Sequence, residues 1–213
     1  MELQCSALLF DLDGVLVDSG AVVERVCRLW AARLGITTEE LLRVAHGRRT
    51  RDTARIVAPH LDPEREAAWI DNQELLDTDG LVEVPGAQRF VRSLPDGKWA
   101  VVTSCGRALA RLRLSTVGIP LPAVIITSED VSNGKPAPDC YRLGAKRLGV
   151  APEACIVFED APPGIAAGLA AGARVVALRT THPDADFSAA AAVIVDYHAL
   201  RVRQSGNSLV VLD

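Results

Sequence analysis

The stretch FDLDGVLVDSG, residues 10–20, places three aspartates within eight residues, directly after the apolar run SALLF of residues 6–10. Asp11 and Asp13 are separated by a single residue, and a glycine follows them. Two carboxylates this close repel one another, and each favours its neutral form unless a positive charge stands nearby. The pattern therefore predicts a short buried strand that ends at a site requiring a cation.

The composition excludes several classes of protein. The chain has 213 residues, 49% of them apolar, which fits one large domain or a core domain with an insert. A net charge of −4 lacks the basic footprint of a nucleic-acid binder, so we expect no nucleic-acid partner. The five cysteines form no CxxC pair, which argues against a zinc site and a disulfide framework.

The sequence also carries no sign of export or membrane insertion. The first residues, MELQCSALLFD, lack the basic region of a signal peptide, and no run approaches the ~18 apolar residues of a membrane span. We therefore expect a cytoplasmic protein with no membrane partner. Nothing in the sequence demands an obligate protein partner.

The chain divides into two parts that differ in the spacing of their apolar residues. Residues 20–84 are typical of helices, as in AVVERVCRLWAARL, where apolar residues recur at helical spacing. From residue 87 onward, amphipathic helices alternate with short apolar strands: WAVVT (99–103), AVIIT (123–127), ACIVF (154–158) and RVVAL (174–178). Such alternation indicates an α/β fold with a parallel sheet covered on both faces. A helical segment is thus inserted after the first strand, and the C-terminal residues LRVRQSGNSLVVLD predict a hairpin around SGNS.

Polar side chains follow the strands of this predicted sheet. They are Asp11 and Asp13, Thr103 and Ser104, Lys135, and Glu159 and Asp160. In open α/β sheets ligands bind outside the carboxyl ends of the strands, so we expect these groups to meet there. Clustered carboxylates suit Mg²⁺, which shares its coordination with water and phosphate, and a lysine provides a charge for phosphate oxygens. The constellation predicts phosphoryl transfer, in which one aspartate attacks phosphorus and the other moves protons.

Four short motifs occur in order along the chain: DLDGVLVDS (11–19), Thr103-Ser104, Lys135-Pro136 and EDAPPG (159–164). Together they resemble the motifs of the haloacid dehalogenase-like (HAD) hydrolase superfamily, and the resemblance covers nearly the whole chain. It implies a Rossmann-like core of residues 1–17 and 85–213, with an α-helical cap of residues 18–84.

The same resemblance implies roles for the individual residues. Asp11 would be the nucleophile and Asp13 the acid/base, while Thr103 and Lys135 would contact the phosphate. Asp160 would bind Mg²⁺ beside Asp11 and the carbonyl oxygen of Asp13. Glu159 would lie on the metal or next to it.

Several branches of the superfamily fit less well. Dehalogenases lack the second aspartate, which is present here as Asp13. The phosphonate-cleaving branch uses a cap lysine, and no lysine occurs between residues 14 and 97. Sugar-phosphate mutases such as β-phosphoglucomutase keep a histidine where this chain has SGAVVERV. A mutase and a phosphoglycolate-type phosphatase stay open as alternatives.

The closest resemblance is to phosphatases of small sugar and polyol phosphates, the glycerol-3-phosphate and 2-deoxyglucose-6-phosphate group. It is carried by HGRRTRD (46–52), EVPG (83–86), KWA (98–100) and FEDAPPGIAAGLAAG (158–172). The expected partner is therefore a small phosphorylated metabolite. His46, Arg49 and Ser104 are predicted substrate contacts, although Arg48 and Arg51 compete with Arg49 and the arginines could equally form a solvated, salt-bridged helix face.

Overall fold

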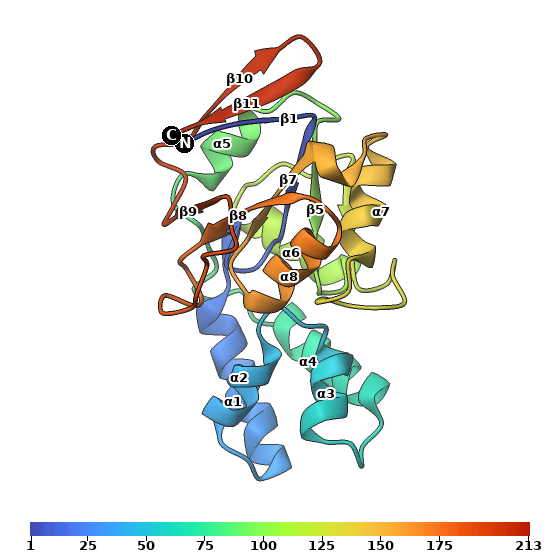
Figure 1. Cartoon of the computed structure of the whole chain (residues 1–213). Coiled ribbons are helices and arrows are strands. Elements are labelled where there is room, and N and C mark those ends of the chain that lie inside the picture. Colours follow the sequence, from blue (N-terminus) through green and yellow to red (C-terminus); the bar gives the residue numbers. More distant parts are fainter.

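The centre of the protein is a six-stranded parallel sheet, described by a computed structural model of residues 1–213 (Figure 1). Its strand order is β6-β5-β2-β7-β8-β9, and all neighbouring pairs are parallel. The strands are β2 (Ala7–Phe10), β5 (Trp99–Val102), β6 (Val124–Ile126), β7 (Cys155–Glu159), β8 (Arg174–Leu178) and β9 (Ala192–Ile194). The predicted α/β class with a parallel sheet is confirmed, and β9 is an additional edge strand that the sequence analysis did not predict.

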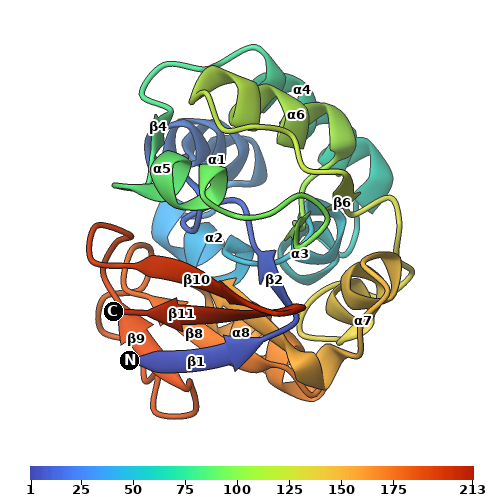
Figure 2. The same cartoon turned by 90° about the horizontal axis from the view of Figure 1, so that it is seen from above.

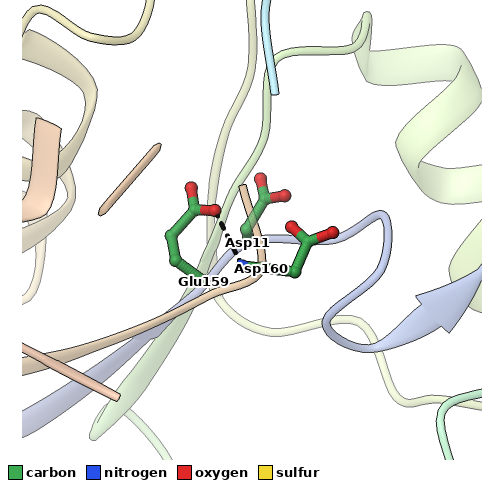
Figure 3. A group of neighbouring side chains, drawn as sticks. All are labelled: Asp11, Glu159 and Asp160. Carbon is green, nitrogen blue, oxygen red and sulfur yellow. Dashed lines mark hydrogen bonds between the residues drawn. The ribbon is translucent and has the colours of Figure 1, made fainter. Parts of the chain in front are cut away.

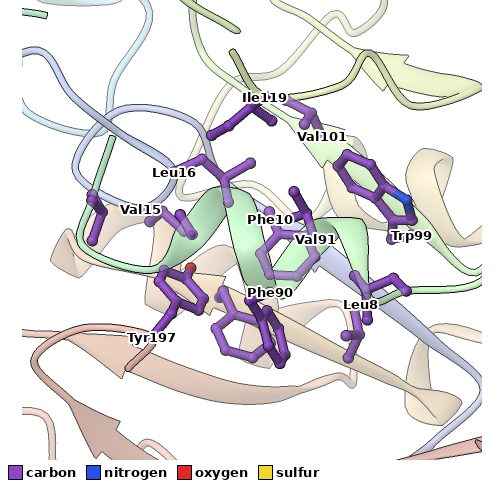
Figure 4. Close-up of a cluster of buried hydrophobic side chains, with 14 of the residues drawn as sticks. Leu8, Phe10, Val15, Leu16, Phe90, Val91, Trp99, Val101, Ile119 and Tyr197 are labelled. Carbon is purple, nitrogen blue, oxygen red and sulfur yellow. The ribbon is translucent and has the colours of Figure 1, made fainter. Parts of the chain in front are cut away.

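Helices cover both faces of this sheet because its central strands are buried on both sides. On one face, Leu8 and Phe10 pack in a cluster with residues of α5 (Ala87–Arg92) and α6 (Arg107–Thr116) (Figure 4). On the other face, Ala7 and Leu9 pack with residues of α7 (Asp139–Arg147) and α8 (Pro162–Ala170). The near-continuous apolar strands of the sequence are the consequence of this double coverage.

Four helices lie together beyond the carboxyl ends of the strands (Figure 1). They are α1 (Gly20–Leu34), α2 (Thr38–Ala45), α3 (Thr50–Val57) and α4 (Pro63–Leu75). They share a small core of their own that includes Val26, Trp30 and Ile70. Thr37 caps α2 in a reciprocal capping box with Glu40, as its place before an apolar helical run predicts.

The two chain segments that join these helices to the sheet lie side by side. They form a short antiparallel pair, β3 (Val17–Asp18) with β4 (Val82–Glu83). This pairing supports a cap boundary close to residues 18 and 84, which we retain as a prediction. No helix of the protein has both the length and the apolar character needed to span a bilayer.

A second, three-stranded antiparallel sheet joins the two ends of the chain (Figure 2). The predicted C-terminal hairpin is present as β10 (Arg201–Ser205) and β11 (Ser208–Leu212). β11 also pairs with β1 (Glu2–Cys5), a strand that the sequence analysis did not anticipate. A short 3₁₀ turn, Pro152–Ala154, precedes β7.

Candidate active site

Three carboxylates meet at the carboxyl ends of the neighbouring strands β2 and β7 (Figure 3). Asp11 follows β2, Glu159 ends β7, and Asp160 comes next in the chain. One oxygen from each lies within 4.8 Å of the others, and all three residues are buried. The sheet thus brings together two of the polar groups that the sequence places 148 positions apart (159 − 11).

Lys135 is the cation of this cluster. Its Nζ donates to Asp11 Oδ1 and to Glu159 Oε1, each at 2.6 Å, and the side chain is only 1% exposed. Burial opposes the charged ammonium, but Asp11 and Glu159 raise the pKa of Lys135 above its ordinary value. A lysine held in this way stays protonated and fixed beside Asp11.

Both oxygens of Glu159 are occupied by donors. Oε1 also accepts from the hydroxyl of Tyr141 at 2.6 Å, and Oε2 accepts from the backbone N–H groups of Asp160 and Ala161 at 3.0 and 3.3 Å. Glu159 therefore braces Lys135 and the turn after β7. The contribution of Tyr141, which lies on α7, was missed by sequence reasoning because a buried tyrosine in a helix is ordinarily part of the core.

Negative charge exceeds positive charge in this buried cluster. Burial raises the pKa of Asp11 although Lys135 opposes the rise, and burial together with Glu159 and Asp11 raises the pKa of Asp160. Three carboxylates facing one ammonium favour either protonation of a carboxyl group or the binding of a further cation. The donors are all oxygen atoms, which is the chemistry that Mg²⁺ prefers, so the residues present fit this ion.

Gly14 lets the chain turn directly against Asp160. Its φ of +74° lies in the left-handed region, and a Cβ at this position would lie 2.0 Å from Asp160 Oδ2. The glycine of the DLDG sequence therefore permits the loop after β2 to approach the carboxylate cluster closely.

Asp13 has donors on both of its carboxylate oxygens. Ser19 Oγ donates to Oδ1 and Arg113 Nη1 donates to Oδ2, each at 2.7 Å. Ser19 occupies the N-cap position of α1 but makes no side-chain cap bond, whereas Asp18 Oδ1 accepts from the N–H of Gly20. The hydroxyl of Ser19 thus donates to Asp13 and does not cap the helix.

Arg113 and Glu74 belong to the site but were missed by sequence reasoning. Arg113 lies on α6 and is 3% exposed; its Nη2 donates to Glu74 Oε2 of α4 at 3.0 Å. Burial raises the pKa of Glu74 to about 7, although Arg113 opposes the rise. A signal was available, because each charge occupies an apolar helix face: Arg113 lies beside Leu109 and Leu114, and Glu74 is one turn from Ile70.

A cavity of ≈ 120 Å³ lies between the carboxylates and the four helices. Asp11, Asp13, Thr103 and Ser104 line its sheet end. The helical side contributes apolar surface, chiefly Val23, Trp30 and Ile70, together with His46, Arg48, Thr50 and Thr53. The cavity therefore offers a polar end of the kind that phosphate requires and a mixed end for the remainder of a small molecule.

Thr103 and Ser104 follow β5 as the sequence predicts. Thr103 is buried, and its Oγ1 donates to Cys105 Sγ at 3.3 Å. Ser104 Oγ donates to the carbonyl oxygen of Gly47 at 3.0 Å, which joins the sheet side of the cavity to the loop after α2. Both residues border the space in front of Asp11.

The predicted substrate contacts of the helical segment separate into two groups. His46 and Arg48 line the cavity, and the His46 ring lies 5.1 Å from the ring of His182, centroid to centroid. Arg49 is not among the residues lining the cavity, because its Nε donates to Asp52 at 2.6 Å and its Nη1 to the carbonyl oxygens of Val131 and Ser132 at 3.0 Å. A substrate contact by Arg49 stays a prediction. Arg48, in contrast, lines the cavity, which is where a residue that contacts the substrate has to lie.

The fold and the site define the class of protein: an α/β enzyme whose acidic centre lies at the strand ends beneath inserted helices. A family model of the haloacid dehalogenase-like hydrolases matches residues 5–172. The chain therefore belongs to the haloacid dehalogenase-like hydrolase family. The resemblance inferred from the four motifs is confirmed.

Relatives and solved structures agree with this assignment. Hexitol phosphatase A of Escherichia coli (strain K12) is 41% identical over 181 residues, which are 83% of this chain and 84% of the relative. Glycerol-1-phosphate phosphohydrolase 2 of Saccharomyces cerevisiae is 34% identical, with 88% of this chain and 79% of the relative covered. The crystal structure of CbbY from Rhodobacter sphaeroides in complex with phosphate matches the fold with a TM-score of 0.79 at 22% identity, covering 91% of this chain and 95% of that one.

Proposed function

We propose that this protein is a Mg²⁺-dependent phosphatase that hydrolyses a small sugar or polyol phosphate through an aspartyl-phosphate on Asp11. The observation that carries the proposal is the buried group of Asp11, Lys135 and Asp160, of which Asp11 lines the polar end of the cavity. Relatives named as phosphatases of hexitol and glycerol phosphates support the substrate class. The cytoplasmic location expected from the sequence stays a prediction.

In the first half of the proposed reaction, a carboxylate oxygen of Asp11 attacks phosphorus and the bond from phosphorus to the leaving alcohol breaks. Lys135, 2.6 Å from Asp11, is the proposed contact of one phosphate oxygen, and Thr103 with the N–H of Ser104 would supply further donors. Asp13 gives its proton to the leaving oxygen. In the second half, Asp13 takes a proton from water, which attacks the phosphoryl group on Asp11 and restores the carboxylate.

Asp11, Asp160 and the carbonyl oxygen of Asp13 are the proposed ligands of Mg²⁺. When bound, the ion neutralises charge on the phosphoryl oxygens and on the aspartates. Glu159 was also predicted as a ligand, but its four hydrogen bonds favour a role in holding Lys135 in place.

The size and lining of the cavity support a small, hydroxyl-bearing leaving group. His46, Arg48 and Thr53 offer donors and acceptors to hydroxyls, and Trp30 offers an apolar wall. A cavity of ≈ 120 Å³ matches a compact alcohol better than a nucleoside. Ser104 donates to the carbonyl oxygen of Gly47, and we propose that this hydrogen bond forms when the helical segment closes over the substrate.

The test is phosphate release with and without Mg²⁺ across hexitol, glycerol, hexose, 2-deoxyhexose and pentose phosphates, phosphoglycolate and nucleotides. We expect Mg²⁺-dependent release that prefers a polyol or sugar phosphate and that disappears in Asp11→Asn. Preference for phosphoglycolate would overturn the substrate class. Interconversion of glucose 1-phosphate and glucose 6-phosphate on addition of a bisphosphate, without phosphate release, would overturn the phosphatase in favour of a mutase.

A further inference from the structure

A continuous chain of ion pairs runs from the helical cap to the acid/base Asp13. Glu74 lies near the end of α4, Arg113 lies on α6 beside the sheet, and Asp13 lies in the loop after β2. Arg113 bridges the other two, with N–O distances of 3.0 Å to Glu74 and 2.7 Å to Asp13. The three residues come from three different elements and all of them line the cavity.

The contacts of Arg113 lie largely away from water. Its side chain is 3% exposed, and that of Glu74 is 11% exposed, so water competes little for either charge. The side chain of Asp13 is 30% exposed on the cavity side and therefore depends on its partners for orientation. Ser19 holds one oxygen of Asp13 and Arg113 holds the other.

We infer that Arg113 is a positioning residue for proton transfer by Asp13, and that Glu74 makes this positioning depend on where the cap lies. The inference rests on the proposed acid/base role of Asp13. The guanidinium of Arg113 orients the carboxylate of Asp13 toward the leaving oxygen. Because the guanidinium is planar, a movement of Glu74 together with α4 rotates the whole group and so changes its contact with Asp13 as well. Proton transfer is then coupled to the cap position in which the cavity surrounds the substrate.

A comparison of leaving groups separates this role from a merely structural one. An alkoxide such as that from glycerol phosphate needs a proton as it departs, whereas 4-nitrophenolate leaves without one. Loss of correct positioning of Asp13 should therefore slow the first turnover of glycerol phosphate, and leave that of 4-nitrophenyl phosphate nearly unchanged. Damage to the fold, to Asp11 or to phosphate binding slows both.

The experiment measures first-turnover rates with both substrates for the wild type, Asp13→Asn, Arg113→Met and Arg113→Lys. We expect Arg113→Met to lower the alkyl rate by about 100-fold and the aryl rate by less than about 5-fold, in the same direction as Asp13→Asn. Arg107→Met is the matched control, because Arg107 lies on the same helix and pairs at 2.6 Å with Asp130, outside the cavity lining. Equal losses on the two substrates in Arg113→Met would overturn the inference.

Arg113→Met alone leaves Glu74 buried without its partner, so the double variant Arg113→Met/Glu74→Gln keeps the charges balanced if the single variant does not fold. We expect Glu74→Gln alone to lower the ratio of alkyl to aryl rates, and to have no further effect on it once Arg113 is replaced. Additive effects would overturn the role of Glu74. A wild type that turns over neither phosphate, or an active Asp11→Asn, would instead refute the proposed function itself.

Discussion

The Nζ atom of Lys135 lies 2.6 Å from Oδ1 of Asp11, although the two residues are 124 positions apart in the chain. Lys135 forms ion pairs with Asp11 and Glu159, and no other cationic side chain forms an ion pair with Asp11, Glu159 or Asp160. The stability of the site and its reactivity therefore depend on the same side chain.

Replacing Lys135 should destabilise the protein and abolish activity. We expect Lys135→Met to lower the free energy of unfolding by about 3–5 kcal/mol, because the buried carboxylates lose their counter-charge. Denaturant unfolding measures the effect. Lys146→Met, at an exposed position on α7, is the control and should change stability by less than about 0.5 kcal/mol. Similar losses in both variants would contradict the expected role of the buried pair.

Replacement of Asp160 by asparagine should have opposite effects on stability with and without Mg²⁺. Burial and neighbouring carboxylates raise its pKa, so Asp160→Asn relieves repulsion and should raise the melting temperature when a chelator is present. At about 100 times its Kd, Mg²⁺ should stabilise the wild type by about 2.7 kcal/mol, and should stabilise Asp160→Asn much less. Thermal melts with Mg²⁺ or EDTA test this, with exposed Asp96→Asn as the control. An equal response to Mg²⁺ in Asp160→Asn would argue against its place in the metal site.

Gly14 and Gly35 share the same backbone conformation but differ in their surroundings. Their φ angles are +74° and +69°, yet a Cβ on Gly35 meets nothing within 4 Å, whereas one on Gly14 meets Asp160. We expect Gly35→Ala to cost about 1 kcal/mol of stability from backbone strain alone. Gly14→Ala should cost more and should also lose the stabilisation by Mg²⁺. Thermal melts of both variants with and without Mg²⁺ decide whether the contact with Asp160 matters.

Arg48 and Arg49 should affect different quantities. Arg48 lines the cavity and makes no ion pair, so Arg48→Met should raise KM about 10-fold at little cost in stability. Arg49 is buried against Asp52 and two carbonyl oxygens, so Arg49→Met should lower stability by about 2–3 kcal/mol. Steady-state kinetics and denaturant unfolding of both variants separate the two roles. A raised KM with unchanged stability in Arg49→Met would restore Arg49 as a substrate contact.

Protonation of His46 and His182 should destabilise the protein in mild acid. Burial, and for His46 also the neighbouring His182, lowers the pKa of each imidazole below 6.5. The folded state then resists protonation of these imidazoles, so their contribution to stability is complete above about pH 6.5 and falls as the pH decreases through the lowered pKa values, by about 1.4 kcal/mol for each unit of difference.

Asp11 and Glu74, whose pKa values burial raises to about 7, stabilise the folded state as the pH falls over the same range, so the histidine effect is the difference between two variants. Unfolding curves between pH 7.5 and 5 should show that, relative to the wild type, His46→Asn becomes more stable as the pH falls, whereas His60→Asn, at an exposed position, should follow the wild type. An identical pH dependence in His46→Asn and the wild type would rule out His46 as a source of the effect.

The sequence by itself determined the sheet and the main residues at its edge. Short apolar strands such as β2 and β7 must be covered on both faces, and parallel strands bring their carboxyl ends to one edge. Asp11 and Asp160, which directly follow the neighbouring strands β2 and β7, therefore meet wherever such a sheet forms. Lys135 lies in the loop between β6 and α7, so its contact with Asp11 also depends on the path of that loop.

Only the tertiary structure decided which charged side chains of the helices contact the residues at that edge of the sheet. The periodicity of α6 shows that Arg113 lies on a buried face, but its partners Asp13 and Glu74 are 100 and 39 positions away and depend on how α4 packs against α6. In the same way, Arg49 turned toward Asp52 while Arg48 faced the cavity, although the two are neighbours in the chain. Periodicity fixes the face on which a side chain lies, whereas its partner is set by the packing of whole helices, whose angles and distances depend on many side chains at once.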